Sequence, residues 1–306
     1  MDAFVQPLYE LADFDAIIRQ LKKPGIVQVS GCLDSQKAHF TNGLLREFPF
    51  RLIVAENDLK AKAFYEDFRL YDPEVLYYPA RDLIFYQADI HGNLLTRQRI
   101  QVLRALLERE EVTIVTSIDS CLDCLVPLAV WKEKVIKIRN DSEIDLDRMK
   151  RHLLELGYEW AAQVEGSGTC FYRGGIMDVF SLTEDNPWRI ELWGDEVDSI
   201  RSFDAESQRS IENLEEITIY PATEVVLDKE TIRQGIKAIE KEAQKSQKKF
   251  RDEMKTEEGA RVRQIAAELK DQLEEMEHIA GAEVLSGIFI RKQNRYWNIC
   301  RRTRWL

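Results

Sequence analysis

A glycine and a lysine six residues apart offer the first prospect of chemistry in this sequence. Residues 26–30 (IVQVS) have the apolar, β-branched composition of a buried strand, and Gly31 and Lys37 follow them. A strand, a glycine-containing loop and a lysine are the parts of a P-loop, which cradles nucleotide phosphates on its backbone N–H groups. The full pattern is G-x-x-x-x-G-K-[ST], whereas this sequence reads GCLDSQKA.

The departures from that pattern remove its chemistry. Gln36 stands where the second glycine belongs, and it disfavours the glycine-permitted dihedrals of the loop. Ala38 lacks the hydroxyl that would hold Mg²⁺, and Asp34 adds negative charge where phosphate oxygens would lie. We therefore expect no cofactor and no catalysis from the residues of this degenerate P-loop: Gly31, Gln36, Lys37 and Ala38. Lys37 is then a solvated lysine at the start of a helix.

Residues 173–209 hold side chains suited to recognition. They read as three short strands joined by tight turns, and side chains along a strand alternate between two faces. The middle strand divides into two rows: Trp188, Ile190 and Leu192 on one face, and Arg189, Glu191 and Trp193 on the other. Arginine beside tryptophan is the mixture that dominates binding hot spots. Two interpretations stay open at this point: Trp193 is exposed for a partner, or it packs under a neighbouring element.

Composition limits the classes of function. With 306 residues the chain has room for two domains, and its 44% hydrophobic and 32% charged content is that of a globular protein. The net charge of -11 argues against nucleic-acid binding by general electrostatics, although it leaves room for a local basic patch. Since no apolar run approaches the roughly 18 residues that span a membrane, and no secretory signal is present, we expect a cytoplasmic protein with no membrane partner.

The cysteines do not predict a metal or redox centre. Their number, five, is odd, which favours free thiols in a reducing compartment. Cys121 and Cys124 form a C-x-x-C pair, but no second pair completes four zinc ligands. We therefore expect no metal site.

The first part of the chain, residues 1–134, alternates apolar runs with helical periods. The runs that read as buried parallel strands are residues 26–30, 51–55, 75–78 and 112–116. Residues 58–71 and 94–110 show helical periodicity between them. This alternation predicts an α/β fold with an open parallel sheet.

The pattern changes at residue 135. A helix over residues 145–156 leads to Gly157, a candidate residue for ending it, and period-two strands with turn signals follow. Residues 135–219 thus predict a small α+β domain built on an antiparallel meander. A buried-strand signal at residues 217–220 is interpreted as the chain re-entering the first domain, which makes the small domain an insertion.

Residues 220–288 are expected to complete the first domain with charged helices. Residues 229–278 are helical in pattern, and Gly259 predicts a break into two helices that pack on the surface of that domain.

Residues 289–306 end in RKQNRYWNICRRTRWL, which has six basic residues and no acidic one. One interpretation is a basic tail for nucleic acid. The other is a non-native, frame-shifted tail, because common codons read in a shifted frame yield FYPETESLLEYLPEDAVA, an ordinary folded-protein sequence. We predict the second.

Several motifs together carry a resemblance to a known family. They are YPARD from Tyr78, TRQRIQVLRALLE from Thr96, VTIVTSIDSC from Val112, and then YRGGIMDVF, RIELWGDEVDSIRSFDAESQRSIE and IYPATE. On these motifs the chain resembles, from near residue 1 to about Ile288, the N-terminal module of bacterial transcription-repair coupling factors, which is similar to UvrB. The tail departs from the family, which supports a truncation.

The resemblance implies a degenerate P-loop NTPase-like parallel sheet with the small α+β domain inserted, and UvrA as the partner of that domain. The family positions that match are Arg173, Arg189 and Trp193, the last where relatives can have Phe. The implied function is recruitment of UvrA in transcription-coupled nucleotide-excision repair. UvrB proteins carry an aromatic hairpin after the matching strand, and the short path from Tyr78 to His91 leaves no room for it.

The resemblance also limits what this chain does by itself. DNA, RNA polymerase, ATP and Mg²⁺ are bound in the family by domains absent here, so we expect no enzymatic activity. The alternative is a fragment of an ATP-dependent DNA helicase or translocase with residual nucleotide binding, which rests on Lys37. A further interpretation is a regulatory clamp that holds the same surface against other domains of an intact protein.

Overall fold

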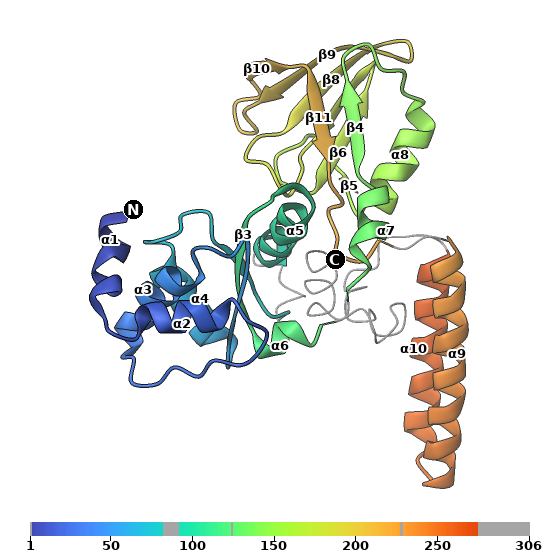
Figure 1. The fold of residues 1–306 in the computed structure, drawn as a ribbon. Helices are drawn as coiled ribbons and strands as arrows, with labels where there is room; N and C mark the ends of the chain where they lie inside the picture. Colours follow the sequence, from blue (N-terminus) through green and yellow to red (C-terminus); the bar gives the residue numbers. More distant parts are fainter. Residues whose placement is uncertain (1, 82–91, 124, 227–228, 275–306) are drawn as a thin grey trace. The chain divides into compact units, whose positions relative to one another are not determined.

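The computed structural model describes residues 2–81, 92–123, 125–226 and 229–274 (Figure 1). Within these residues the chain forms two compact units. Unit 1 comprises residues 2–81 and 101–123, and unit 2 comprises residues 92–100, 125–226 and 229–274. No described helix is long and apolar enough to cross a membrane.

Unit 1 is built on a parallel sheet with the strand order β1-β3-β2. Its strands are β1 (Phe50–Ala55), β2 (Leu76–Tyr78) and β3 (Val112–Ser117). Every residue of the central strand β3 is buried, as expected for a parallel strand between two neighbours. The predicted parallel strands at residues 51–55, 75–78 and 112–116 are therefore confirmed.

Short helices surround these strands. They are α1 (Asp2–Val5), the 3-10 helix η1 (Gln6–Glu10), α2 (Phe14–Leu21), α3 (Asp34–Leu45), α4 (Asp58–Phe68), the second half of α5 (Gly92–Glu108), and α6 (Ile118–Cys121). The predicted helical segments 58–71 and 94–110 correspond to α4 and α5. Helix α4 begins after Asn57, whose side chain accepts a hydrogen bond from the N–H of Lys60 at 2.9 Å.

The predicted strand at residues 26–30 is wrong. These residues form no regular element, and Ile26 is 99% exposed. Strand β1 is an edge of the described sheet, and no described strand pairs with residues 26–30. An apolar, β-branched run becomes a strand only when a neighbour supplies hydrogen bonds and burial, and here that neighbour is lacking.

Unit 2 contains a larger sheet of order β10-β9-β8-β7-β6-β5. Its strands are β5 (Glu159–Trp160), β6 (Thr169–Arg173), β7 (Ile176–Val179), β8 (Trp188–Trp193), β9 (Glu196–Phe203) and β10 (Ser210–Leu214). All neighbours are antiparallel except β5 and β6, which are parallel. The predicted antiparallel meander is thus confirmed from β6 to β10.

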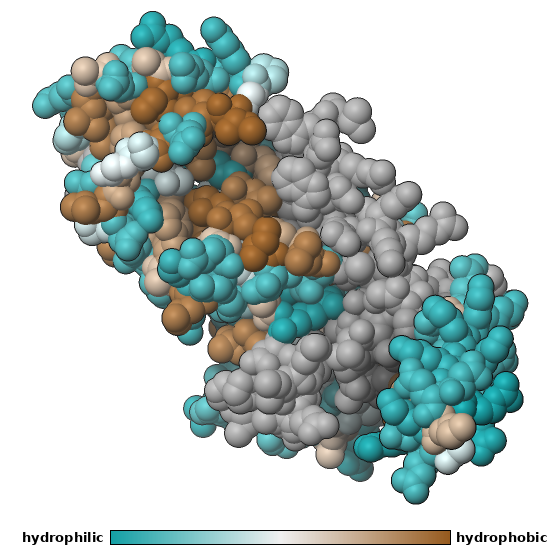
Figure 2. Space-filling view, turned by 90° about the horizontal axis from the view of Figure 1, so that it is seen from below, coloured by the Kyte–Doolittle hydropathy of each residue, from teal (hydrophilic) through white to brown (hydrophobic). Residues whose placement is uncertain are grey.

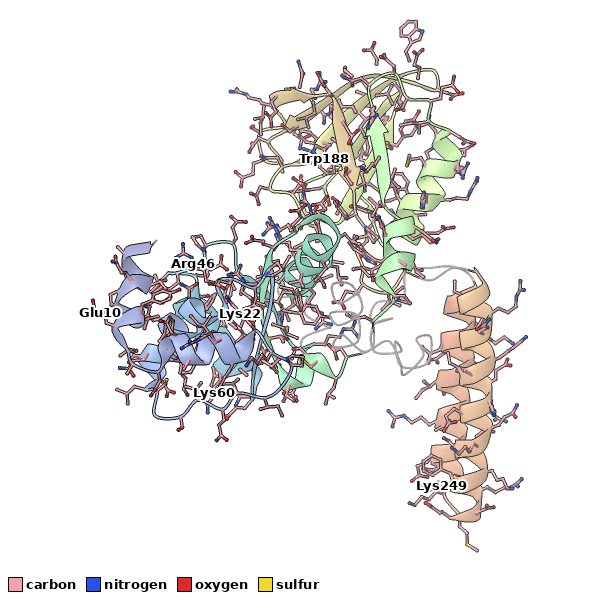
Figure 3. The ribbon with its side chains drawn as sticks, viewed as in Figure 1. Glu10, Lys22, Arg46, Lys60, Trp188 and Lys249 are labelled. Carbon is pink, nitrogen blue, oxygen red and sulfur yellow. The ribbon has the colours of Figure 1, made fainter. Side chains whose placement is uncertain are left out.

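One face of this sheet forms a core. Its strands place these buried side chains on that face: Cys170, Met177, Val179, Trp188, Ile190 and Ile200. Figure 3 shows Trp188 within the body of this domain. The predicted apolar row of β8 is therefore the inward row, although Leu192 at its end is only partly buried. Burial raises the pKa of the Cys170 thiol to about 12, so this cysteine stays a neutral core residue.

The ends of the small domain pair with each other. Strand β4 (Ile136–Arg139) and strand β11 (Glu216–Ile219) form a separate two-stranded antiparallel sheet, with Ile136 opposite Ile219. The interpretation that residues 217–220 re-enter the first domain is therefore wrong: this strand joins the strand that begins the small domain. Its apolar residues Ile217 and Ile219 are buried by that pairing.

Helix α8 (Leu146–Glu155) ends in a Schellman motif, as the sequence predicts from Gly157. The N–H of Tyr158 donates to the carbonyl of Leu153 at 3.0 Å, and the N–H of Gly157 donates to that of Leu154 at 2.9 Å. Gly157 has a φ of +85°, and a Cβ added there would lie 2.9 Å from Cγ2 of Thr223.

Residues 220–226 (YPATEVV) form a wholly buried strap across unit 2. Backbone and side chains of the unit hold it: the Ala222 N–H donates to the carbonyl of Leu156 at 2.8 Å, and the Tyr158 hydroxyl donates to the carbonyl of Tyr220 at 2.8 Å. The Trp131 indole N–H, from α7 (Leu128–Glu133), donates to the carbonyl of Thr223 at 3.3 Å. Burial raises the pKa of the Tyr158 hydroxyl, so it remains a proton donor.

A buried ion pair completes the attachment of the strap. The guanidinium of Arg99, in the first half of α5, donates from Nε and Nη2 to the two carboxylate oxygens of Glu224, the second at 2.9 Å. The two side chains are 2% and 3% exposed. Since a buried charge is tolerated only when it is paired and hydrogen-bonded, the two residues must come together for either to be buried.

The charged C-terminal segment forms a helical hairpin of α9 (Lys229–Asp252) and α10 (Thr256–Glu274). The break predicted at Gly259 lies instead at residues 253–255, where Met254 takes a left-handed φ of 59°. Gly259 is inside α10, with Phe250 of α9 as its neighbour. A Cβ at this position would lie 3.8 Å from Cβ of Phe250, an ordinary contact, so Gly259 neither breaks the helix nor is required by the packing here.

Some predictions fall outside the described residues. They are the tail at residues 289–306, Cys124, and residues 82–91, which include His91. Those predictions are left as they stand.

The Schellman motif at Gly157 gives a test of the fold. Gly157→Ala places a Cβ at a φ of +85° and 2.9 Å from Cγ2 of Thr223, so it should lower the free energy of unfolding by about 1–3 kcal/mol. Gly166→Ala is the matched control, because its Cβ meets nothing within 4 Å. Urea unfolding followed by tryptophan fluorescence measures both. Equal midpoints for the two variants would contradict the role given to Gly157.

Candidate partner-binding surface

The face of the six-stranded sheet opposite the core carries rows of polar and aromatic side chains. We call it the outer face. The strand registers place Arg173, Ile176, Glu191 and Ser199 in one row and Phe171, Asp178, Arg189 and Arg201 in the next. All of these side chains come from β6, β7, β8 and β9, so the meander itself positions the predicted residues together.

Trp193 ends β8 and is exposed. It pairs with Glu196 across the β8–β9 turn, and a register shift between Glu191 and Leu192 precedes it. The shift arises because β9 carries one extra residue there, so the alternation along β8 continues and keeps Trp193 on the outer face. Its exposure is 84%, compared with 6% for Trp188 in the same strand. The interpretation that Trp193 packs under a neighbouring element is therefore wrong.

Arg173 ends β6 beside a tight turn. Gly174 and Gly175, with φ values of 61° and 84°, form the predicted two-residue turn to β7. The N–H of Leu192 donates to the carbonyl of Gly175 at 2.7 Å, which fixes this turn against β8. Among the described residues, the exposed Arg173 guanidinium has no hydrogen bond or ion pair. It is thus available to an external acceptor.

Arg189 lies on the same face but is already engaged. Its Nε and Nη2 donate to the two carboxylate oxygens of the buried Asp178, at 2.8 and 2.6 Å. Nη2 also donates to the side-chain carbonyl of Gln208 at 3.1 Å, and the guanidinium carbon lies 4.4 Å from the ring centre of Phe203. The hydrogen bond to Asp178 raises the pKa of Arg189. Its side chain is 20% exposed, so Arg189 is first of all the counterion of Asp178.

A second pair occupies the next position on the face. Arg201 is ion-paired to Glu191 at 2.5 Å, and the hydroxyl of Ser199 donates to the same carboxylate at 3.0 Å. Their side chains are about a third exposed. With these two cations neutralised, Arg173 is the cation of the face that lacks an internal partner within the described chain.

The sequence analysis missed Asp178 and Gln208. Gln208 has a left-handed φ of 59°, and its amide nitrogen donates to the carbonyls of Val164 and Ala205, at 3.3 and 2.8 Å. These contacts aim its carbonyl oxygen at Arg189. A signal was present for Asp178, since an isolated acid in an apolar strand next to an arginine-containing strand indicates a buried pair.

The segment that the sequence predicts to be a degenerate P-loop has a simple local structure. Lys37 lies in the first turn of α3, and its ammonium is 2.6 Å from the carboxylate of Asp34. That hydrogen bond lowers the pKa of Asp34 and raises the pKa of Lys37. Gln36 accepts a hydrogen bond from the N–H of Leu33 at 3.2 Å, and Ala38 is buried in the core. The prediction of a solvated lysine at a helix start is confirmed, whereas the P-loop ancestry of this segment stays a prediction.

The described residues contain no group of three or more His, Cys, Asp or Glu side chains that could hold a metal ion. The outer face combines an exposed indole, a guanidinium without a described partner, and neutralised charges around them.

Comparison with known proteins identifies the region that carries this face. Residues 136–225 match the UvrB interaction domain. The match begins at the first residue of β4 and ends inside the buried strap, so it covers the outer face completely. This match confirms the UvrB-like part of the predicted resemblance, whereas the truncation stays a prediction.

Curated relatives extend the similarity beyond this domain. The chain is 33% identical over 256 residues to the transcription-repair-coupling factor of Bacillus subtilis, which covers 82% of this chain and 22% of that protein. It is 30% identical over 241 residues to the UvrABC system protein B of Thermosipho africanus, which covers 78% of this chain and 36% of that protein. The chain thus spans between about a fifth and a third of the length of these relatives.

The ion pair on the outer face gives a stability test. Arg189→Gln leaves the buried Asp178 carboxylate without its counterion, so the free energy of unfolding should fall by about 2–4 kcal/mol. Arg201→Gln is the matched control on the same face, where the exposed pair with Glu191 is expected to contribute less than about 1 kcal/mol.

Removing both charges sharpens this test. Asp178→Asn combined with Arg189→Gln should recover part of the loss, giving a coupling energy of at least about 1 kcal/mol in a double-mutant cycle of urea unfolding. Strictly additive effects, or a control as destabilised as Arg189→Gln, would show that the pair is not structurally coupled.

Proposed function

We propose that this chain recruits UvrA in transcription-coupled nucleotide-excision repair, through the outer face of its UvrB interaction domain. The observation that carries the proposal is the exposed Trp193. An indole that is 84% exposed at a strand end is unfavourable in water, and association with a partner removes that apolar area from solvent.

The charges around Trp193 have distinct roles in this proposal. Arg173 is the recognition cation, because its guanidinium is exposed and forms no ion pair with any described residue. An acidic group on UvrA can accept a two-pronged hydrogen bond from it. Arg189 contributes by holding the face in shape through Asp178, while the accessible part of its guanidinium meets the partner. The aromatic anchor and the free cation together match the composition of binding hot spots.

The proposal assigns no ATP-dependent step to this chain. A nucleotide phosphate at α3 would have to displace the Asp34 carboxylate from Lys37, and no hydroxyl is available at Ala38 to hold Mg²⁺. We assign the RNA polymerase contact of a coupling factor to parts of such proteins other than this segment.

The first binding test concerns Trp193. Trp193→Ala should weaken binding of purified UvrA by about 2–4 kcal/mol, because it deletes the apolar anchor, while Trp193→Phe should retain most of the affinity. Trp160→Ala is the matched control, since Trp160 is 41% exposed on β5, an edge strand of the same sheet that is not adjacent to β8. Calorimetry or surface capture measures the affinities.

Arg173 supplies the second arm of this test. Arg173→Ala should weaken UvrA binding by about 1–3 kcal/mol without changing the urea midpoint, unlike Arg189→Ala, which should lower both. Undiminished UvrA capture by the Arg173→Ala, Trp193→Ala double variant would defeat the proposed function.

A nucleotide-binding test addresses the alternative. Titration with a fluorescent ATP analogue in the presence of Mg²⁺ should give no saturable binding below about millimolar concentration, and Lys37→Ala should change nothing. Micromolar affinity that disappears in Lys37→Ala would instead support a residual nucleotide site.

A further inference from the structure

The α9–α10 hairpin ends in a hollow of about 440 Å³ that the outer face does not involve. The residues that line it are Gln244, Gln247, Lys248, Arg251, Lys255, Thr256, Gly259, Ala260 and Arg263. No carboxylate is among them, although the hairpin as a whole is rich in Glu. Charges of one sign are therefore concentrated at this place in a chain whose net charge is -11.

Helical geometry produces this concentration. Residues three, four and seven apart lie on one face of a helix, and the lining residues of α9 (Gln244, Gln247, Lys248 and Arg251) have that spacing. Thr256, Gly259, Ala260 and Arg263 repeat it on α10. Gly259 and Ala260 contribute only small groups to the lining, and Lys255 joins it from the turn between the two helices.

The cations of the hollow are accessible. Lys248, Arg251 and Arg263 are exposed, and none forms an ion pair with a described residue. Lys255 forms an ion pair with Glu253, which does not line the hollow, with 2.9 Å between Nζ and Oε2. Figure 2 views the hairpin from its tip, at the right, where the surface is almost entirely hydrophilic, and Figure 3 labels Lys249 near the same end.

We propose that this hollow binds the sugar–phosphate backbone of a nucleic acid. Backbone recognition requires Lys and Arg with polar donors such as Gln and Thr, which is the composition of the lining. A protein partner would need an apolar or aromatic anchor, and no lining side chain is an apolar group larger than that of alanine. The contact is independent of sequence, because only phosphates are neutralised.

Fluorescence anisotropy with a labelled 20-base-pair DNA duplex and the full chain tests the proposal at about 50 mM salt. If three or four phosphates are neutralised, the logarithm of the association constant should fall linearly with the logarithm of the salt concentration, with a slope of about three. The triple variant Lys248→Gln, Arg251→Gln, Arg263→Gln should lower the affinity at least tenfold and remove most of that slope.

The matched control is the triple variant Lys237→Gln, Lys241→Gln, Arg261→Gln. It removes the same charge from the same two helices at positions that do not line the hollow. Its affinity should change less than threefold. Circular dichroism should show equal helix content in both triple variants, and Trp193→Ala should leave duplex binding unchanged.

Several results would overturn the proposal. They are absence of duplex binding by the unaltered chain, equal losses in the two triple variants, displacement of the duplex by inorganic phosphate at matched ionic strength, and equal competition by polyglutamate. The last two would assign the hollow to small anions or to an acidic peptide.

Discussion

The buried pair of Arg99 and Glu224 is the constraint on which the arrangement of unit 2 depends. Each side chain is almost completely removed from water, so each requires the other to satisfy its charge and hydrogen bonds. Arg99 precedes the small domain in the chain and Glu224 follows it. The pair therefore closes a loop of 125 residues, and the outer face is presented from inside that loop. Trp131 and Tyr158 add hydrogen bonds to the same strap, which makes the closure a cooperative set of contacts.

Local sequence patterns predict those parts of the outer face that depend only on residues close together in the sequence. The alternation along β8 places Trp188 and Trp193 on opposite faces of the sheet. The turn from β6 to β7 is predictable because Gly174 and Gly175 readily take the positive φ values that it requires. The ion pair of Asp178 with Arg189 was not foreseen, because it depends on the register of β7 against β8 across an intervening loop. The β4–β11 pairing was mistaken for the same reason: its partners are about 80 residues apart in the sequence.

Residues 26–30 and the helical hairpin illustrate a different limit. A strand-like composition states only what a segment is able to form, and without a described strand beside them residues 26–30 form no regular element and stay mostly exposed. In the hairpin, the break falls at residues 253–255 with Met254 at a left-handed φ, while Gly259 lies inside α10 despite its low intrinsic helix propensity. Both cases show that intrinsic propensity alone does not decide between local alternatives.

The pairing of β4 with β11 bears on how the small domain is joined to the rest of the chain. Opposed residues of an antiparallel pair have Cα atoms only about 5 Å apart, so the polypeptide enters and leaves the small domain at nearly one point. A segment whose two ends lie side by side in this way is compatible with the adjacent ends of a surface loop, which is the geometry that tolerates an inserted domain.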